Sequence, residues 1–335
     1  MRVGLTYNLK RTVAEGEDLP PDFYAECDDP ETIEDVRGAL MARHGDVVMI
    51  EADEDAFEKF RKTRPDIVFN MAEGIWGESR EAQMPAIMEM LRIPYTGSSP
   101  LTLGLCLNKA RAKEVLEHYG VPTPRFFVTE GAALRPGMRF PMMVKPLFEG
   151  SSKGIKNDSI VSTPDELSGK VGRLVAEYGQ PALVEEFLPG REFTVAILGN
   201  GAKARALPIV EINYSSLPEG IPPIYSYEAK WVLDTPDAPL DIFACPAPVD
   251  EAMRKSIEDA ALAAFRALDV RDWCRVDVRL DAAGVPNIIE LNPLPGILKD
   301  PKCNSCFPKA ARAAGLTYDD LINSVVDIAR QRHGI

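Results

Sequence analysis

The stretch RVDVRLDAAGVPNIIELNPLPGI, residues 275–297, decides the fold of this chain. Two runs rich in β-branched residues flank the segment LDAAGVP, and this pattern is typical of a β-hairpin. We expect Leu280 to pair with Val285 across the turn. The same register places Arg275 opposite Glu290, and paired residues share one face of a sheet.

The two faces of this hairpin are predicted to differ in chemistry. Side chains alternate along a strand, so one face holds Arg275, Asp277, Glu290 and Asn292. The other face holds Val276, Ile289 and Leu291, and Asp277 stands opposite Ile288. Two carboxylates and an amide oxygen without His or Cys suit a hard cation such as Mg²⁺, which leaves Arg275 to meet an anion. The residues alone equally allow an ion pair between Arg275 and Glu290 with no metal.

Composition narrows the class of protein. The chain has 335 residues, of which 45% are hydrophobic, and a formal net charge of −13. This charge argues against nucleic acid or an anionic membrane surface as a partner. No apolar stretch approaches the ~20 residues of a membrane span, and the first residues, MRVGLTYNLK, lack an apolar signal core, so we expect a cytoplasmic location. Cys303 and Cys306 form a lone C-x-x-C, which predicts neither a zinc site nor redox chemistry.

The order of the expected elements predicts two kinds of domain. Up to about residue 100, apolar strands alternate with helices, which indicates a parallel α/β domain. The crevice of such a sheet lies beyond the carboxyl ends of its strands, so the polar loop NMAEGIWGESREAQ, residues 70–83, is the informative part there. From residue 123 onward, closely spaced strands and two closing helices near 250–268 and 317–331 indicate an α+β unit with a mainly antiparallel sheet.

A nucleotide site is the next question. Neither G-x-x-x-x-G-K-[ST] nor G-x-G-x-x-G occurs, which disfavours a P-loop or Rossmann site. In PMMVKPLFEGSSKGIK, residues 141–156, an apolar strand leads through Lys145 into a loop rich in glycine and serine. Backbone N–H groups of such a loop can approach phosphates, and a lysine can neutralise them. The alternative is an ordinary flexible turn with a solvated lysine.

A hinge between two strands follows in PALVEEFLPGREFTVAIL, residues 181–198. Its backbone at Phe187 and Leu188 would read an adenine base, Glu185 would accept from the amino group of the base, and Glu192 would accept from ribose hydroxyls. Glutamates at strand ends are otherwise ordinary solvated residues.

Taken together, five segments resemble the motifs of the ATP-grasp superfamily, and more narrowly its D-alanine–D-alanine ligase-like branch. They are VKPLFEGSSKG, LVEEFLPGREFTV, YEAKW, CRVDVRLD and IIELNPLPG. The resemblance runs from about Asp66 to the C-terminus. It implies an α/β N-terminal domain (1–100) followed by an α+β ATP-grasp fold of two subdomains that grip ATP. These are a central subdomain (101–187) and a C-terminal one (188–335) that carries the Mg²⁺ and catalytic residues.

The resemblance implies an ATP site, residue by residue. Lys109 and Lys145 hold the α- and β-phosphates, and Lys230 reaches the γ-phosphate. The loop that closes over the phosphates contains Glu149, Gly150, Ser151 and Ser152. The residues that hold adenosine are Glu185, Phe187, Leu188 and Glu192.

It also implies the metal ligands and the catalytic set. Asp277, Glu290 and Asn292 ligate two Mg²⁺ ions, for which Mn²⁺ can substitute. Arg275 and the backbone N–H of Gly296 stabilise the oxyanion that forms when an amine attacks an acyl phosphate, and Ser151 and Lys230 complete the catalytic set. Phosphoryl transfer to a carboxylate needs charge neutralisation rather than an acid–base residue.

The departures from the family pattern lie on the amino-acid side. The segment TYNLKRTVAEGEDL, residues 6–19, stands where the family has a Gly-Gly-x-Ser loop and a glutamate for the ammonium of the first substrate. Trp231 replaces a tyrosine and Glu73 a histidine. Ser305, in a longer segment after Gly296, keeps the spacing to the next proline and is expected to contact a substrate carboxylate. The candidates to replace the missing glutamate are Glu73, Glu15, Glu17 and Asp18.

The predicted function is an ATP-dependent carboxylate–amine ligase that forms a peptide-like bond through an acyl phosphate and releases ADP and phosphate. Its substrates are a small-molecule carboxylate and an amine, and an amino acid other than D-alanine is expected. One alternative is a D-alanine–D-alanine ligase of cell-wall synthesis with a diverged site. Another is a nucleotide-binding protein without catalytic activity. The resemblance also implies a homodimer.

Overall fold

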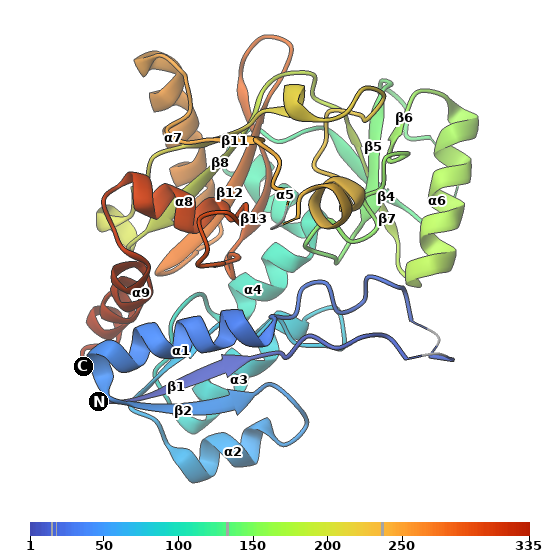
Figure 1. Cartoon of the computed structure of the whole chain (residues 1–335). Helices are drawn as coiled ribbons and strands as arrows, with labels where there is room; N and C mark the ends of the chain where they lie inside the picture. Colours follow the sequence, from blue (N-terminus) through green and yellow to red (C-terminus); the bar gives the residue numbers. More distant parts are fainter. Residues whose placement is uncertain (15, 18, 132–133, 236–237) are drawn as a thin grey trace.

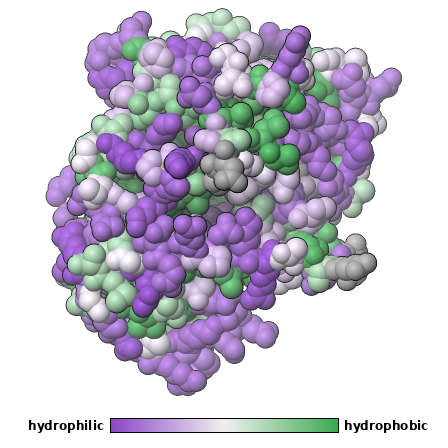
Figure 2. Space-filling model, in the orientation of Figure 1, coloured by the Kyte–Doolittle hydropathy of each residue, from purple (hydrophilic) through white to green (hydrophobic). Residues whose placement is uncertain are grey.

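The computed structural model describes residues 1–14, 16–17, 19–131, 134–235 and 238–335. It contains three sheets, each with its own helices (Figure 1). The first domain lies at the bottom of the view, and the other two sheets lie above it, with α4 (Pro100–Leu107) between the upper and lower parts. The exposed face in Figure 2 is mostly hydrophilic, with a group of hydrophobic side chains in its upper part.

The first domain has the predicted parallel α/β architecture. Its strands pair in the order β2-β1-β3, all parallel. The strands are β1 (Arg2–Tyr7), β2 (Asp46–Glu51) and β3 (Ile67–Asn70), and the helices are α1 (Pro30–His44), α2 (Ala56–Thr63), η1 (Arg80–Ala82) and α3 (Gln83–Leu91). The loops after β1 and β3 leave the carboxyl ends of neighbouring strands, so both reach the edge where a site is expected.

The central sheet is antiparallel, in the order β4-β7-β5-β6. Its strands are β4 (Phe126–Thr129), β5 (Met142–Pro146), β6 (Ile160–Val161) and β7 (Ala182–Glu186), and α5 (Lys109–His118) and α6 (Pro164–Tyr178) accompany it. Val144 and Val184 of the sheet pack with Leu167, Val171 and Leu174 of α6 in one hydrophobic cluster. Lys145 belongs to the same strand as Val144, so alternation along β5 directs it to the opposite face.

The C-terminal sheet is also antiparallel, in the order β11-β10-β8-β12-β13, with β9 beside β8. Its strands are β8 (Glu192–Leu198), β9 (Arg205–Ala206), β10 (Val210–Ile212), β11 (Phe243–Ala244), β12 (Trp273–Leu280) and β13 (Pro286–Asn292). The helical segments are η2 (Gly201–Lys203), η3 (Tyr214–Ser216), η4 (Ala229–Leu233), α7 (Glu251–Ala267), α8 (Cys306–Ala313) and α9 (Tyr318–His333). The mainly antiparallel second unit and both closing helices are therefore confirmed. The structure also contains α8, directly before the second of these helices.

The first and C-terminal domains share one hydrophobic core. Leu5 and Leu40 of the first domain belong to the same cluster as Phe307, Leu321 and Val325 of α8 and α9. The proposed boundaries at 100 and 187 fall at the first residue of α4 and directly after β7. The shared core means that these boundaries separate sheets rather than independently packed bodies.

A buried aspartate also connects the first domain to the C-terminal domain. Asp272 is fully buried, and its carboxylate accepts hydrogen bonds from the Gly97 N–H (2.8 Å), from Asn200 (2.7 Å) and from Arg332 (2.8 and 3.0 Å). These partners lie in the linker after the first domain, in the turn after β8 and in α9. Each is a charge-assisted bond in a protein interior, so the three segments are fixed relative to one another.

The β12–β13 hairpin forms, but in a different register from the one predicted. The Asp281 N–H donates to the Val285 carbonyl (3.0 Å) and the Gly284 N–H to the Asp281 carbonyl (3.0 Å). Asp281 therefore pairs with Val285, and the turn has one residue more than expected. The Asp281 carboxylate stabilises this turn by accepting from the Ala283 and Val285 N–H groups, each at 2.8 Å. Gly284 supplies the left-handed conformation, with φ of +79°, which favours glycine.

A β-bulge then restores the predicted face for Glu290. The pairing shifts from Val278↔Ile288 to Asp277↔Glu290, so Ile289 is the extra residue. A one-residue slip alone would move Glu290 to the other face, and the bulge moves it back. The predicted face is right, whereas the predicted partners were wrong: Arg275 stands opposite Asn292.

Two apolar residues of the hairpin also differ from the prediction. Ile288 is fully buried in the hydrophobic core with Val276 and Val278. Ile289 lines the cavity described below, on the same side as Glu290. Both corrections have the same cause, because a bulge shifts the alternation of side chains along the strand.

Candidate active site

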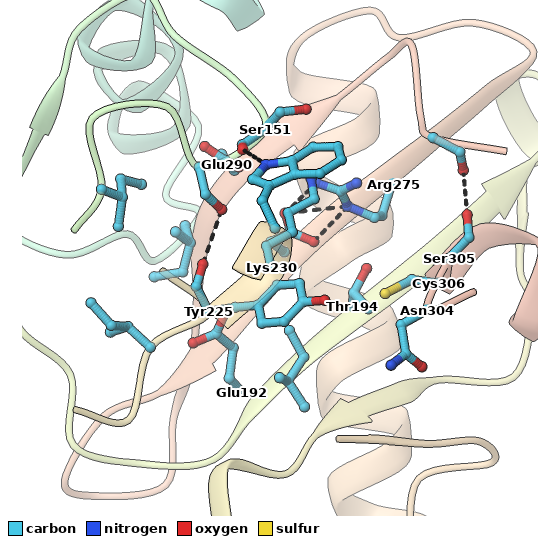
Figure 3. A pocket seen from close by; sticks show the side chains of 18 of the residues that line it. Ser151, Glu192, Thr194, Tyr225, Lys230, Arg275, Glu290, Asn304, Ser305 and Cys306 are labelled. Carbon is cyan, nitrogen blue, oxygen red and sulfur yellow. Dashed lines mark hydrogen bonds and ion pairs between the residues drawn. The ribbon is translucent and has the colours of Figure 1, made fainter. Parts of the chain in front are cut away.

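Two adjoining cavities lie where the three sheets meet. The large cavity, about 280 Å³, has both ATP-grasp sheets in its wall and includes Met143, Phe187, Thr194, Asp277 and Ile289. The small cavity, about 120 Å³, includes Glu73, Glu81, Lys109, Asn292 and Pro295, and the first domain contributes to the walls of both cavities. The residues that line both are Glu26, Asp28, Ser151, Lys230, Arg275, Glu290, Gly296 and Ile297. Figure 3 shows Lys230, Arg275 and Glu290 close together in this region.

Every residue predicted for the site except Glu149 lines one or both cavities. The Glu149 carboxylate instead contacts Lys153, Arg80 (3.3 Å) and Gln180 (2.8 Å). Its place in the phosphate loop is as expected, but its side chain serves an ion cluster rather than the cavity.

Two buried lysines pair with Glu185, and of these Lys145 lines the large cavity. Lys145 is 2% exposed, and its Nζ lies 2.7 Å from Glu185 Oε1. Lys113 Nζ lies 3.0 Å from Glu185 Oε2. Burial alone would raise the pKa of Glu185, but Lys113 and Lys145 lower it. Glu185, predicted to accept from adenine, therefore balances two buried cations, since a buried charge needs a partner.

Lys113 was missed by the sequence analysis. It lies four residues after Lys109 on α5, a spacing that puts both lysines on one helix face. Burial lowers its pKa to about 8. The i, i+4 spacing of the two lysines was the available signal.

The adenosine side differs in part from the prediction. The Phe187 N–H donates to the Pro141 carbonyl (3.0 Å), so it is not free to read a base. Leu188 lines the large cavity. The Glu192 carboxylate pairs with Arg279 (2.6 Å), and the Arg279 guanidinium lies over the Phe187 ring, 4.5 Å from its centroid. Arg279 was not predicted, and it orients Glu192 at the cavity wall.

The loop over the predicted phosphate site is held from two sides. Gly150 donates its N–H to Glu26 Oε1 (2.5 Å), and Ser152 donates its hydroxyl to the Tyr225 carbonyl (2.9 Å). The Trp231 indole N–H donates to the Ser151 carbonyl (3.2 Å), and Ser151 adopts a φ of +48°. Non-glycine residues rarely adopt this conformation, so its contacts with both neighbouring domains must stabilise it.

Glu26 is the centre of a buried ion cluster that the sequence analysis missed. Its Oε2 lies 2.7 Å from Arg80 and 2.9 Å from Lys153. The side chains of all three residues are less than a tenth exposed. Burial alone would raise the pKa of Glu26, but Lys153 and Arg80 lower it to about 2. The cluster thereby ties the first domain to the loop at Gly150.

The predicted metal ligands lie together on the β12–β13 pair. Asp277 accepts hydrogen bonds from Arg275 (2.9 and 3.0 Å) and from Asn292 Nδ2 (3.0 Å). Arg275 thus pairs with Asp277, so the predicted alternative, a pair with Glu290, is wrong. Glu290 lies 3.5 Å from Lys109, and although burial would raise its pKa, Lys109, Lys145 and Arg275 lower it to about 2.

This donor set fits Mg²⁺. Asp277 and Glu290 pair directly across the strands, and Asn292 hydrogen-bonds to Asp277. In the described part of the chain, no three His, Cys, Asp or Glu side chains gather as a metal site. Two carboxylates and an amide suit an ion that keeps waters and takes phosphate oxygens as further ligands.

The four cations predicted for the site come from four separate elements. Lys109 begins α5 and contacts the Glu149 carbonyl, Lys145 lies in β5, Lys230 in η4 and Arg275 in β12. Burial and the charge of Arg275 lower the pKa of Lys230 to about 8. Four cations gathered at one site in a chain of net charge −13 mark a local binding site for anions.

The segment after Gly296 folds back on itself. The Ser305 hydroxyl donates to the Gly296 carbonyl (3.1 Å) and accepts from the Leu298 N–H (3.3 Å). Ser305 also lines the large cavity, and its predicted contact with a substrate carboxylate stays a prediction. Cys306 lines the large cavity, and burial raises its pKa to about 12. The sequence analysis did not place it in the site.

Glu73 lies where the first domain faces the small cavity, beside Asp28 and Glu81. Of the other candidates for the missing glutamate, Glu15 and Asp18 lie outside the described residues. Glu17 is exposed and accepts a hydrogen bond from the Ala14 N–H (2.9 Å). Of the two candidates that the structure describes, Glu73 is therefore the one that lines the cavity.

The chain is similar to known proteins along most of its length. The family model described as D-ala D-ala ligase C-terminus matches residues 125–327. The chain is 33% identical to the D-alanine–D-alanine ligase of Pelotomaculum thermopropionicum over 91% of this chain and 92% of the relative. It is 40% identical to the uncharacterized protein y4sG of Sinorhizobium fredii over 80% of this chain and 75% of the relative.

The fold also matches solved structures. The crystal structure of the D-alanine–D-alanine ligase from Bacillus anthracis aligns with a TM-score of 0.75 and 25% identity, over 100% of this chain and 99% of that one. The same enzyme complexed with ATP aligns with a TM-score of 0.74 and 24% identity, over 100% and 98%. Within the described residues, no helix is both long and apolar enough to cross a membrane.

Proposed function

Since the chain belongs to the D-alanine–D-alanine ligase family of ATP-grasp enzymes, we propose that it joins a carboxylate to an amine through an acyl phosphate, and that the carboxylate belongs to an amino acid other than D-alanine. The chain is an ATP-dependent ligase of this family. One observation carries the proposed chemistry: Lys230, Arg275, Glu290 and Gly296 line both cavities. ATP in the large cavity and a substrate in the small one would meet at these residues.

In the first step, an oxygen of the substrate carboxylate bonds to the γ-phosphorus of ATP, the bond to the β–γ bridging oxygen breaks, and ADP leaves. Lys109 and Lys145 neutralise the α- and β-phosphates, and Lys230 the γ-phosphate. The residues that would hold Mg²⁺ are Asp277, Glu290 and Asn292. When bound, Mg²⁺ supplies further neutralisation of the phosphate charge.

In the second step, the amine attacks the acyl carbon, its carbonyl oxygen becomes an oxyanion, and phosphate leaves as the amide forms. The proton lost by the amine goes to phosphate or solvent. Arg275 and the Gly296 N–H donate hydrogen bonds to the oxyanion. Asp277 accepts from both Arg275 Nε and Nη2, which fixes the plane of the guanidinium before the reaction begins.

The proposal of a substrate other than D-alanine rests on Trp231 and Glu73. The Trp231 indole N–H is taken up by the Ser151 carbonyl, and an indole has no acceptor to offer in place of a tyrosine hydroxyl. Glu73 brings a carboxylate to the small cavity where the family has an imidazole. A changed set of buried polar partners changes specificity strongly.

Two other functions stay as candidates. The names of the relatives favour a D-alanine–D-alanine ligase with an altered site. A catalytically silent nucleotide-binding protein is disfavoured by the intact set of Lys145, Lys230, Arg275, Asp277 and Glu290 around the cavities.

The experiment measures ADP release from ATP and Mg²⁺ with D-alanine alone and with a panel of L-, D- and β-amino acids, dipeptides and other carboxylates, with products identified by mass spectrometry. Lys145→Met is the control, because it should abolish release with every substrate. The highest kcat/KM for D-alanine would establish the altered D-alanine–D-alanine ligase instead. Nucleotide binding without ADP release from any mixture would favour the silent protein.

We further propose a homodimer and a cytoplasmic location, both on the family resemblance. Light scattering of the purified protein tests the first, and fractionation of the producing cell tests the second.

A further inference from the structure

The first-domain wall of the small cavity is acidic and lacks internal partners. Asp28 precedes α1, Glu73 follows β3, and Glu81 lies in η1. Glu81 is 9% exposed. Within the described residues, none of these three carboxylates accepts a hydrogen bond or forms an ion pair. Glu26, a few residues before Asp28, contrasts with them, since Arg80 and Lys153 both pair with it.

The other two domains contribute cations to the same cavity. They are Lys109, Lys230 and Arg275, which the proposed mechanism assigns to phosphates and to the reacting carboxyl group. A molecule in this cavity therefore meets carboxylates from the first domain and cations from the other two domains. We call the surface formed by Asp28, Glu73 and Glu81 the acidic wall.

The acidic wall is electrostatically unbalanced when it is empty. Burial, and then Glu81, Glu26 and Asp28, raise the pKa of Glu73 well above its ordinary range. Burial, together with the charge of Glu26, raises the pKa of Glu81 to about 7, against the opposing effect of Arg80, Lys109 and Lys153. Burial and Asp29 raise that of Asp28 to about 8. Asp28 and Glu73 are half-buried and Glu81 is buried. Carboxylates withdrawn from water without partners are costly in their charged form, and a bound cation would relieve that cost.

The arrangement favours an organic cation over a metal ion. No group of three His, Cys, Asp or Glu side chains in the described part of the chain is close enough to hold one ion. The carboxylates are therefore spread along the wall rather than converged on a point. One ammonium group has three N–H donors at a single nitrogen, so a single one does not span a wall of this kind.

We propose that the acidic wall binds two positively charged nitrogen groups of the carboxylate substrate, and that this substrate is a diamino acid. The inference rests on the proposed function, because it uses the same cavity. A diamino acid matches both sets of charges: its carboxylate faces Arg275 and Lys230, and its two ammonium groups face Glu73 and Glu81. The structure thus assigns to Glu81 a role in specificity that the sequence did not suggest.

The first test compares substrates of matched length in the ADP-release assay. 2,4-Diaminobutyrate, ornithine and lysine, each as both enantiomers, are paired with 2-aminobutyrate, norvaline and norleucine. We expect the best diamino acid to exceed its neutral partner in kcat/KM by on the order of 100-fold, because a site built for a polar group rejects an analogue that lacks it. A neutral partner that is equally good or better would overturn the inference, while ADP release would still support the ligase.

Variants identify the residues responsible. Glu81→Gln and Glu73→Gln keep the side-chain volume and should each lower the preference for the diamino acid at least 10-fold, mainly through KM. The matched control is Glu54→Gln, an exposed carboxylate in the same domain, which should leave the preference unchanged. An unchanged preference in both Glu81→Gln and Glu73→Gln would overturn the assignment.

A binding measurement separates this inference from the proposed function. Ornithine and norvaline are titrated calorimetrically into the full-length protein with Mg²⁺ and a non-hydrolysable ATP analogue. Binding of ornithine that Glu81→Gln weakens would support the acidic wall even if no mixture releases ADP. Equal affinity for norvaline and ornithine would refute it whether or not the protein turns over.

Discussion

Replacing Glu26 with glutamine should weaken the contacts between the first domain and the predicted phosphate loop around Gly150. Glu26 accepts the Gly150 N–H at 2.5 Å and lies within 2.9 Å of both Arg80 and Lys153. Its side chain is 8% exposed, so solvent does little to screen these charges. Glutamine preserves the shape but leaves Arg80 and Lys153 to share Glu149 alone.

The size of the effect follows from the charge interactions. The pKa of Glu26 falls from its ordinary 4.5 to about 2, a difference that corresponds to about 3 kcal/mol of folding free energy. Breaking a buried ion pair by removal of one partner typically costs ~3–5 kcal/mol. Because the pKa is lowered on folding, this stability is fully present above pH 4.5 and is lost as the pH falls toward 2. We therefore expect Glu26→Gln to lose about 3 kcal/mol at pH 7.

Urea unfolding followed by circular dichroism measures the loss, and tryptic cleavage after Lys153 reports on the loop. Glu54→Gln, on the surface of the same domain, is the matched control and should change stability by less than about 0.5 kcal/mol. A double-mutant cycle with Lys153→Met should be strongly non-additive, because the two side chains are in contact. A loss below about 1 kcal/mol, or additive effects in the cycle, would refute the reasoning.

The other predictions concern the cavities. Asp277→Asn should remove turnover yet retain weak nucleotide binding, since it deletes a proposed Mg²⁺ ligand, and normal ADP production at ordinary Mg²⁺ concentrations would contradict this. Affinity for a non-hydrolysable ATP analogue, measured by calorimetry, should fall above about pH 8, because burial and Arg275 lower the pKa of Lys230 to about 8 and a neutral lysine no longer attracts the γ-phosphate. Lys230→Arg should bind the analogue without this pH dependence, and the same pH dependence in that variant would assign the effect to another group. Burial raises the pKa of Cys306 to about 12, so this thiol should resist alkylation by iodoacetamide at pH 8 until the protein is unfolded. Alkylated Cys306 in the native protein, detected by peptide mass spectrometry, would contradict this.

The sequence by itself determined the fold class, the family and the chemical character of the hairpin face. These rest on local signals. Alternation of apolar residues with period two sets which side chains share a face, and the motifs around Lys145 and Glu290 are contiguous stretches of chain. Even the failed register of the hairpin kept Asp277 and Glu290 together, because a longer turn and a bulge cancelled each other.

The tertiary structure alone decided which charged groups are partners. Glu185 pairs with Lys113 and Lys145, and Glu26 reaches Gly150 across 124 residues of sequence. A glutamate carries no local signal that tells a solvated carboxylate from a buried one. The role of a glutamate depends on which cations, remote in sequence, the packing of the three sheets brings close to it. In the low dielectric of the interior, an ion pair is strong and an unpaired carboxylate such as that of Glu81 is costly.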